Sequence, residues 1–129
     1  MKLLDTCFLI QLQREWVLKQ PGPAVRYLER HAGEQFGVSV IATLEFLEGY
    51  QRPADGERFL DPFPQLPVTM QVARTGSRIR RELRRKGELI GDFDILIAAT
   101  ALEAGMIMVT DNARHFEPIE GLVVEAYQD

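Results

Sequence analysis

Four segments of the chain carry carboxylate or amide side chains that one cleft could gather. In chain order these residues are Asp5, Glu45, Asp94, Asp111 and Asn112. Carboxylates held close together cannot all stay ionised unless a cation lies among them. Oxygen-only ligands select hard ions such as Mg²⁺ or Mn²⁺, and these ions activate water and neutralise charge on a phosphodiester. The set therefore predicts metal-dependent phosphodiester hydrolysis.

Each acid also has a purely structural interpretation. Asp94 could cap a helix, and Asp111 with Asn112 could form a turn. Asp5 is harder to explain in this way, because a carboxylate inside an apolar segment is costly unless it is paired or binds a metal. We expect Asp5 and Asp94 to hold the principal ion and Glu45 to orient or deprotonate the attacking water. Asp111 or Asn112 would complete the surroundings of the ion.

Other polar residues near these acids are weaker candidates. Thr6 and Thr110 adjoin two of the acids in sequence and could hydrogen-bond the acids or the substrate. A helix cap or a polar strand residue is an equally good interpretation of either one. Cys7, His31 and His115 have no spacing typical of zinc binding or nucleophilic catalysis. We therefore expect no catalytic role for these three.

Alternating strands and helices must position the acids, because the period of the apolar side chains switches repeatedly along the chain. Strands are predicted at 2–5, 36–41, 67–69, 106–110 and 122–125, and helices at 6–19, 23–32, 43–50, 57–60, 71–86 and 94–103. Such alternation implies a parallel sheet with helices on both faces. Ligands of such sheets bind beyond the carboxyl ends of the strands, where the acids lie.

Apolar faces are predicted for the longer helices. The first helix would turn Phe8, Leu12 and Trp16 to one side, and the second would bury Ala24, Leu28 and Ala32. The helix at 71–86 has an apolar stripe with i, i+4, i+7, i+11 spacing. It consists of Val72, Gly76, Ile79 and Leu83.

Length and composition describe an ordinary globular protein. The chain has 129 residues, of which 46% are hydrophobic and 26% are charged, so we expect a single domain over 1–129 with its own core. No apolar run approaches the ~20 residues that span a bilayer. The early Asp5 argues against a signal peptide, and the single cysteine excludes an intrachain disulfide. A cytoplasmic location is expected.

The net charge of −4 conceals one strongly basic segment. Residues 74–86 carry a charge of +6, whereas the rest of the chain carries −10. Four of its arginines repeat the spacing of the apolar stripe two residues out of step, which places them about 200° around the helix. They are Arg74, Arg78, Arg81 and Arg85. A solvated face, a surface for RNA phosphates and a docking site for an acidic segment all remain open.

Several segments resemble the acidic blocks of PIN-domain ribonucleases, most closely the VapC toxins of bacterial toxin–antitoxin pairs. These segments are LLDTC, SVIATLEFLEG, IGDFDILIAATAL and MVTDNARHFEPIEGL. They occur in the same order over nearly the whole chain, and IRRELRRKG before the third block also fits. The resemblance implies a three-layer α/β/α sandwich with a mainly parallel sheet. It also implies Mg²⁺- or Mn²⁺-dependent RNA cleavage leaving 5′-phosphate and 3′-hydroxyl ends, a homodimer, and inhibition by a small antitoxin.

Carried over by position, the resemblance makes Asp5 the first-block metal ligand, Glu45 the second-block acid and Asp94 the third-block acid. The fourth-block position falls on Asn112, with Asp111 beside it. Two further residues depart from the family pattern. Cys7 replaces the usual asparagine of the first block, and Asp92 is an extra acid.

Two other functions are compatible with an α/β chain of this length. A phosphoacceptor receiver domain would need paired acids after the first strand and a lysine after a late one, but Asp5 stands alone and Thr110-Asp111 brings no lysine. A PIN-like module that binds RNA or a partner without cleaving is the second alternative. The acids at Asp5, Glu45 and Asp94 speak against it.

Overall fold

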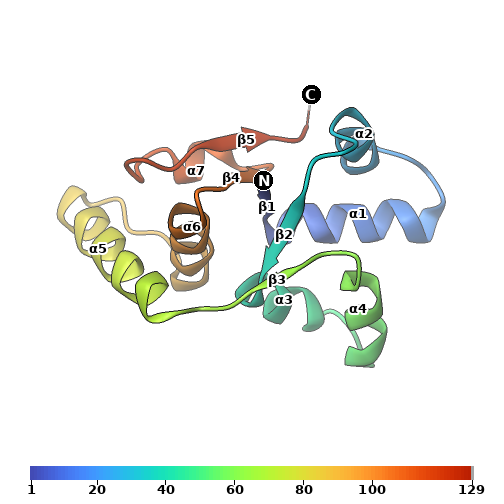
Figure 1. Cartoon of the computed structure of the whole chain (residues 1–129), viewed down its shortest axis with the longest axis horizontal. Helices are drawn as coiled ribbons and strands as arrows, with labels where there is room; N and C mark the ends of the chain where they lie inside the picture. Colours follow the sequence, from blue (N-terminus) through green and yellow to red (C-terminus); the bar gives the residue numbers. More distant parts are fainter. Residues whose placement is uncertain (129) are drawn as a thin grey trace.

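The computed structural model describes residues 1–128 and contains a five-stranded sheet with helices around it (Figure 1). Its strands are β1 (Lys2–Leu4), β2 (Phe36–Ser39), β3 (Gln65–Leu66), β4 (Ile107–Thr110) and β5 (Val124–Ala126). They follow the order β3-β2-β1-β4-β5, and every neighbouring pair is parallel. β1 is central, and its last residue Leu4 pairs with Val109 of β4. The carboxyl ends of these two strands therefore meet.

Helices cover the sheet from two sides, which confirms the α/β/α architecture. They are α1 (Thr6–Leu18), α2 (Pro23–Arg30), α3 (Val40–Leu47), α4 (Pro53–Leu60), α5 (Met70–Lys86), α6 (Asp92–Ala104) and α7 (Ala113–Phe116). Figure 1 shows α1 and α2 on one side of β1, and α5 and α6 on the other. No helix within residues 1–128 is long and apolar enough to cross a membrane.

The core follows the predicted apolar patterns closely. Side chains of the central strands, such as Leu3, Leu4 and Met108, are fully buried, as expected for a sheet covered on both faces. The whole predicted stripe of α5 is buried as well. Gly87 then ends α5 in the left-handed conformation, with φ of 71°, which a residue without a Cβ adopts easily.

Two predicted element boundaries are wrong because local caps decide them. The Ser39 hydroxyl accepts a hydrogen bond from the Ile41 backbone N–H at 3.0 Å, so β2 stops at Ser39 and α3 starts at Val40. The third strand lies at Gln65–Leu66 rather than 67–69. Pro67 has no N–H for a ladder bond, and Thr69 caps α5 by accepting a bond from the Val72 N–H.

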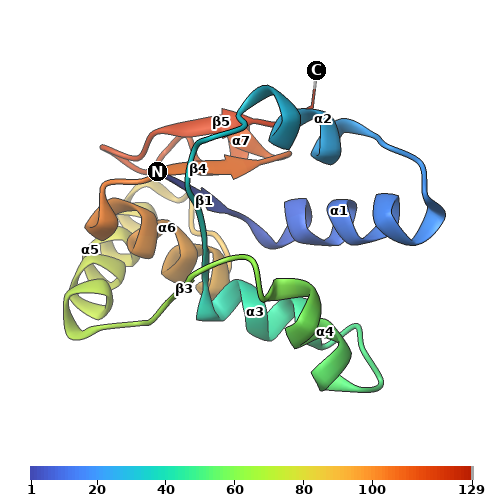
Figure 2. The same ribbon diagram turned by 45° about the vertical axis from the view of Figure 1, so that its right-hand side comes forward.

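Two side chains and the start of one helix also differ from the predicted pattern. Trp16 is 71% exposed, because α1 runs outward from the sheet toward its C-terminal end (Figure 2). Ala32 is exposed because α2 already ends at Arg30, and Tyr27 is buried in its place. The fourth helix begins at Pro53, earlier than the predicted start, since proline suits the first turn.

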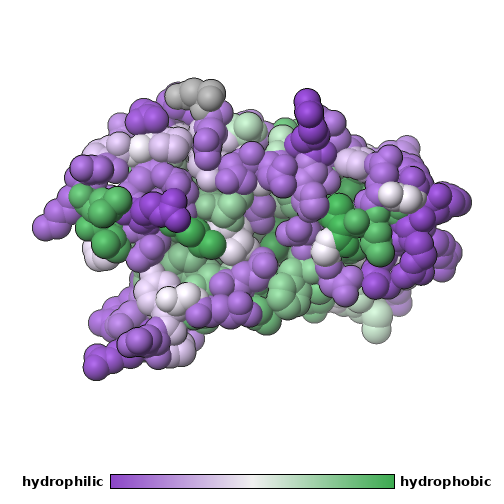
Figure 3. All heavy atoms as spheres, turned by 180° about the vertical axis from the view of Figure 1, so that it is seen from behind, coloured by the Kyte–Doolittle hydropathy of each residue, from purple (hydrophilic) through white to green (hydrophobic). Residues whose placement is uncertain are grey.

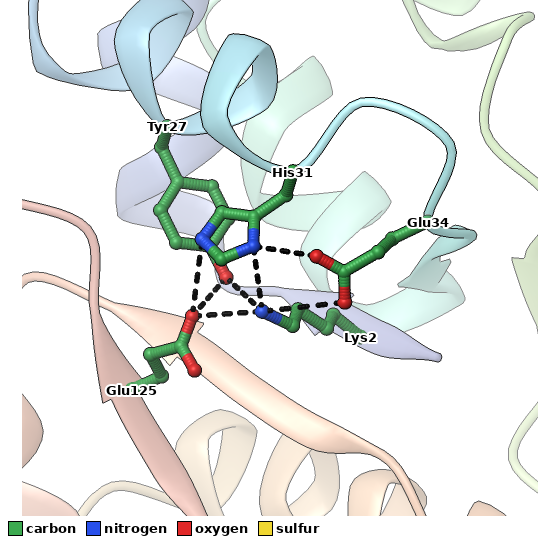
Figure 4. A network of polar contacts seen from close by, with 5 residues as sticks. All are labelled: Lys2, Tyr27, His31, Glu34 and Glu125. Carbon is green, nitrogen blue, oxygen red and sulfur yellow. Dashed lines mark hydrogen bonds and ion pairs between the residues drawn. The ribbon is translucent and has the colours of Figure 1, made fainter.

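A polar network around the buried Lys2 joins α2 to the sheet (Figure 4). The Lys2 Nζ donates to Glu125 Oε1 at 2.8 Å and to Tyr27 Oη at 3.0 Å, and it lies 3.6 Å from Glu34 Oε1. Burial alone would lower the pKa of Lys2, but these hydrogen bonds outweigh it and raise the pKa. His31, expected on a surface helix, is half-buried with its Nδ1 3.2 Å from Lys2 Nζ. The network is structural.

Glu15 is a buried acid with a structural task that the sequence does not reveal. Its carboxylate accepts backbone hydrogen bonds from Gly22 at 2.6 Å, Ala24 at 2.9 Å and Val25 at 3.0 Å. These are free N–H groups at the start of α2, where Gly22 has no side chain to cap them. Burial would raise the pKa of Glu15, but the hydrogen bonds lower it on balance.

Candidate active site

Asp5 lies directly after the central strand, at the joint between β1 and β4. Its side chain caps α1, because Oδ1 accepts the Thr6 backbone N–H at 2.8 Å, so Asp5 rather than Thr6 is the helix cap. Its Oδ2 accepts the Thr110 hydroxyl at 2.8 Å. Only 7% of the residue is exposed. Burial raises the pKa of Asp5 despite both hydrogen bonds, and the charge of Asp94 raises it further.

Thr110 connects Asp5 to the fourth acidic segment. Its hydroxyl donates to Asp5 and accepts the Asn112 backbone N–H at 3.2 Å. The backbone N–H of Asp111 lies 3.4 Å from the Cys7 sulfur. Asn112 stands at the N-cap position of α7 without a side-chain cap bond, and both Asp111 and Asn112 are exposed. The segment therefore contacts Asp5 through the Thr110 hydroxyl, whereas Asp111 and Asn112 are exposed.

Glu45 comes to the same region from α3. Its Oε1 accepts the Thr6 hydroxyl at 2.7 Å, so Thr6 touches one predicted acid through its side chain and Asp5 through its backbone. Together with Asp94, Glu45 lines a pocket of about 390 Å³ whose other lining residues are Gly91, Asp92 and Phe93. The fold thus brings the second and third acidic blocks to one surface hollow.

Asp94 lies in the first turn of α6, and the N-cap of that helix is Gly91. The capping interpretation of Asp94 is therefore wrong. Its Oδ2 accepts a hydrogen bond from His115 Nε2 of α7 at 3.1 Å. Both side chains are about one-third exposed. His115 is a contact of the site that spacing did not reveal; its only sequence signal was its place three residues after Asn112.

Asp92, the extra acid, points to the basic helix. Its Oδ1 accepts a hydrogen bond from Arg80 Nε of α5 at 2.9 Å. Asp92 also lines the pocket of Glu45 and Asp94, so this ion pair stands at the rim of the site.

Cys7 fills the position of the usual asparagine and lies against the acids. Its sulfur is 3.6 Å from Asp5 Oδ2 and 3.4 Å from Thr110 Oγ1. Burial, followed by the charge of Asp5, raises the pKa of the Cys7 thiol to about 12. A thiol that stays protonated is a poor nucleophile.

The donor chemistry of the site fits a hard divalent cation. Asp5, Glu45 and Asp94 offer only carboxylate oxygens, and Glu45 and Asp94 each have one oxygen without a hydrogen bond within residues 1–128. Across the same residues, no group of three or more His, Cys, Asp or Glu side chains is placed to hold a metal ion. Each acid is held instead by a neighbour: Asp5 by Thr110, Glu45 by Thr6, and Asp94 by His115.

Known proteins are similar to this chain in sequence and in fold. A family model described as PIN domain matches residues 2–121. Ribonuclease VapC19 of Mycobacterium tuberculosis is 34% identical over 119 residues, which cover 90% of this chain and 92% of that protein. The tRNA(fMet)-specific endonuclease VapC of Salmonella typhimurium is 34% identical over 95 residues, 68% of this chain and 72% of the relative.

Solved structures agree with the sequence relatives. DNA-bound VapBC from Salmonella typhimurium superposes with a TM-score of 0.82 at 28% identity, covering 98% of this chain and 99% of that one. The fold also matches VapBC2 from Rickettsia felis, with a TM-score of 0.80, 24% identity and 97% of each chain covered. The chain therefore belongs to the PIN-domain family and, within it, to the VapC ribonucleases. This membership excludes a receiver domain.

Proposed function

We propose that the chain is a Mg²⁺- or Mn²⁺-dependent endoribonuclease and the toxin of a VapBC-type pair. The observation that carries the proposal is the buried Asp5, whose carboxylate accepts the Thr110 hydroxyl at the end of β4 and whose pKa is raised by burial and by the charge of Asp94. A buried carboxylate lowers the stability of the fold unless it is paired or binds a metal. Metal binding would therefore explain why the fold keeps this acid. The VapC relatives are named ribonucleases, which supports RNA as the substrate.

In this proposal each acid has a separate task. Asp5 and Asp94 hold the metal ion, which would lower the pKa of bound water and neutralise charge on the phosphate. Glu45, oriented by the Thr6 hydroxyl, accepts the proton of the attacking water. The water oxygen forms a bond to phosphorus as the bond to the 3′ oxygen breaks. The departing 3′ oxygen takes a proton from solvent water, which gives 5′-phosphate and 3′-hydroxyl ends. Asp111 or Asn112 would complete the surroundings of the ion.

The test is cleavage of labelled RNA by the purified chain. Asp94→Asn should lower the rate at least roughly a hundredfold, because it removes charge from a metal ligand with little change in shape. Excess EDTA should abolish cleavage, and added Mg²⁺ or Mn²⁺ should restore it. Asp61→Asn removes an exposed carboxylate at the end of α4 and should leave the rate unchanged.

The same assay separates the enzyme from a binding module. A wild-type chain that binds RNA but cleaves none with either metal would support the PIN-like module without activity. Full activity of Asp94→Asn, with its fold intact, would remove Asp94 from the site.

An apolar groove supports the antitoxin as partner. It lies between α1 and α4, has a volume of about 680 Å³, and is lined mainly by apolar and aromatic side chains, among them Leu12, Trp16, Val17, Tyr50, Phe59 and Phe63. The indole of Trp16 packs edge-on against Phe59 with ring centres 6.3 Å apart. In Figure 3, apolar surface gathers at the left-hand end, next to a notch between the α1 end and the α4 lobe. An amphipathic helix of the antitoxin fits such a groove.

Two further features belong to the proposal. The chain would pair as a homodimer, as the family resemblance implies. It would act in the cytoplasm, where RNA is at hand and a lone thiol such as Cys7 stays reduced.

A further inference from the structure

The outer face of α5 is strongly basic, and Glu82 is the one acid of this helix. Four arginines, Arg74, Arg78, Arg81 and Arg85, are all exposed. None of the four forms an ion pair with any residue in 1–128. Figure 3 shows mostly hydrophilic side chains at the right-hand end of the molecule, where α5 lies. Solvated faces of helices usually mix charge signs, so this surface calls for an explanation.

The positive surface leads to the pocket of the acids. Arg80 reaches Asp92 at the pocket rim, with 2.9 Å between Nε and Oδ1. Arg84 is exposed and follows Arg80 by one helical turn, so it lies on the same side of α5. Arg81 and Arg85 are the next residues around the helix. Cationic side chains thus extend from the pocket rim to the outer face of α5.

We propose that the outer face of α5, defined by Arg74, Arg78, Arg81 and Arg85, binds the phosphates of single-stranded RNA and leads the strand to the pocket. This inference rests on the proposed ribonuclease function and names how its substrate is held. The four arginines span twelve residues, and the eleven steps between the first and the last cover about 16 Å of helix. Guanidinium groups suit this task, because their planar donors match phosphate oxygens.

Charge distribution favours RNA over an acidic protein segment as the ligand. The chain outside residues 74–86 carries −10, so most of its surface repels a polyanion. A nuclease with so much negative charge needs a local cationic surface next to its active site to hold RNA. The outer face of α5 provides such a surface. An antitoxin already has the apolar groove between α1 and α4, on the side of the molecule away from α5 in Figure 1.

The experiment measures binding of a labelled single-stranded RNA of about 20 nucleotides and mixed sequence. Asp94→Asn is present in every protein, and EDTA is added, so that the RNA stays intact. Arg81→Gln with Arg85→Gln should weaken binding about tenfold or more near 0.1 M salt. Each lost phosphate contact lowers the slope of log Kd against log salt by about 0.7, so the slope should fall by about 1.4.

Two matched variants control for net charge and for folding. Arg14→Gln with Arg26→Gln removes the same charge from exposed positions on α1 and α2 and should leave the affinity and the slope nearly unchanged. Arg81→Lys with Arg85→Lys keeps the charge and should retain most of the binding. In proteins that retain Asp94, the Gln pair should raise KM for RNA cleavage and leave kcat unchanged.

Three outcomes would overturn the inference. The first is unchanged RNA affinity and slope in the Gln pair. The second is an equal loss in the Arg14/Arg26 control, which would reflect net charge alone. The third is normal RNA binding with weakened antitoxin binding, which would assign the face to the partner. Failure of the proposed function is distinct, because wild type would then cleave no RNA whatever happens at α5.

Discussion

Replacing Asp5 by asparagine should stabilise the protein in the absence of metal. The carboxylate is 7% exposed, and both burial and the charge of Asp94 raise its pKa. The ionised form is therefore less favourable in the folded chain than in the unfolded one, and at pH 7 this difference subtracts from stability. Asparagine has nearly the same shape and removes the charge.

The magnitude follows from opposing contributions. Asparagine can still accept the Thr6 backbone N–H through its oxygen, so the cap of α1 survives. Its NH₂ group faces the Thr110 hydroxyl, which already accepts the Asn112 N–H and must redirect its own proton. That rearrangement costs about 1 kcal/mol. Neutralising a strained functional charge commonly stabilises a protein by about 0.5–2 kcal/mol. If the gain lies at the upper end of this range, subtracting the cost of the rearrangement leaves a net stabilisation of about 1 kcal/mol.

A net gain of ~1 kcal/mol should raise the melting temperature in EDTA by roughly 3–6 °C for a chain of this size. The dependence on pH has a definite sign. The destabilising effect of the ionised Asp5 is absent below its unfolded pKa of ~4, grows between the unfolded and the folded pKa, and is complete above the folded pKa. The stabilising effect of the variant should therefore be present at pH 7 and be lost in acid.

Thermal melts of both proteins in EDTA and in Mg²⁺ provide the assay. Mg²⁺ should stabilise wild type more than the variant, because a ligand that binds only the folded state adds its binding free energy to stability. If Asp5 is purely structural, the variant melts lower in EDTA and Mg²⁺ makes no difference between the two. That result would refute the metal-site reasoning at its best-defined residue.

Two further predictions concern the groove and the buried acid of α1. Trp16→Asp should weaken binding of the cognate antitoxin at least about tenfold by calorimetry, since it puts a charge into an apolar groove. Leu18→Asp, which changes an exposed residue of the same helix outside the groove, is the control. Equal affinities of the two variants would exclude the groove as the docking site. Glu15→Gln should lower stability by roughly 2 kcal/mol at pH 7, because a neutral amide accepts the N–H groups of α2 less strongly than a carboxylate. Because the pKa of Glu15 is lowered, its stabilising effect is present above the unfolded pKa and is lost in acid. Denaturant melts should therefore show the stabilities of the two proteins converging as the pH falls. A stability difference that stays constant between pH 7 and acid would contradict the assigned role of Glu15.

Much of the architecture follows from local pattern, and the sequence therefore predicts it. The stripe from Val72 to Leu83 has helical spacing, and the structure buries all of it. The strand that ends at Thr110 is an apolar run followed by Asp111 and Asn112, and it lies between β1 and β5 in the sheet. The predicted boundaries are wrong where one capping side chain overrides the strand propensity of its neighbours. At Ser39, for example, the hydroxyl accepts a backbone hydrogen bond that ends the strand and starts the helix.

Two of the acids that the sequence singled out, Glu45 and Asp94, line one pocket. Parallel strands align their carboxyl ends, so a residue after β1 and a residue at the end of β4 must be neighbours, as Asp5 and Thr110 are. The sequence alone could not distinguish the acids of the site from the structural acid Glu15. Only the tertiary structure brings the start of α2 against the Glu15 carboxylate. Spacing likewise gave no sign that His115 contacts Asp94 or that Arg80 contacts Asp92. Such pairs depend on how α5, α6 and α7 pack, and packing is decided by the whole chain rather than by any one segment.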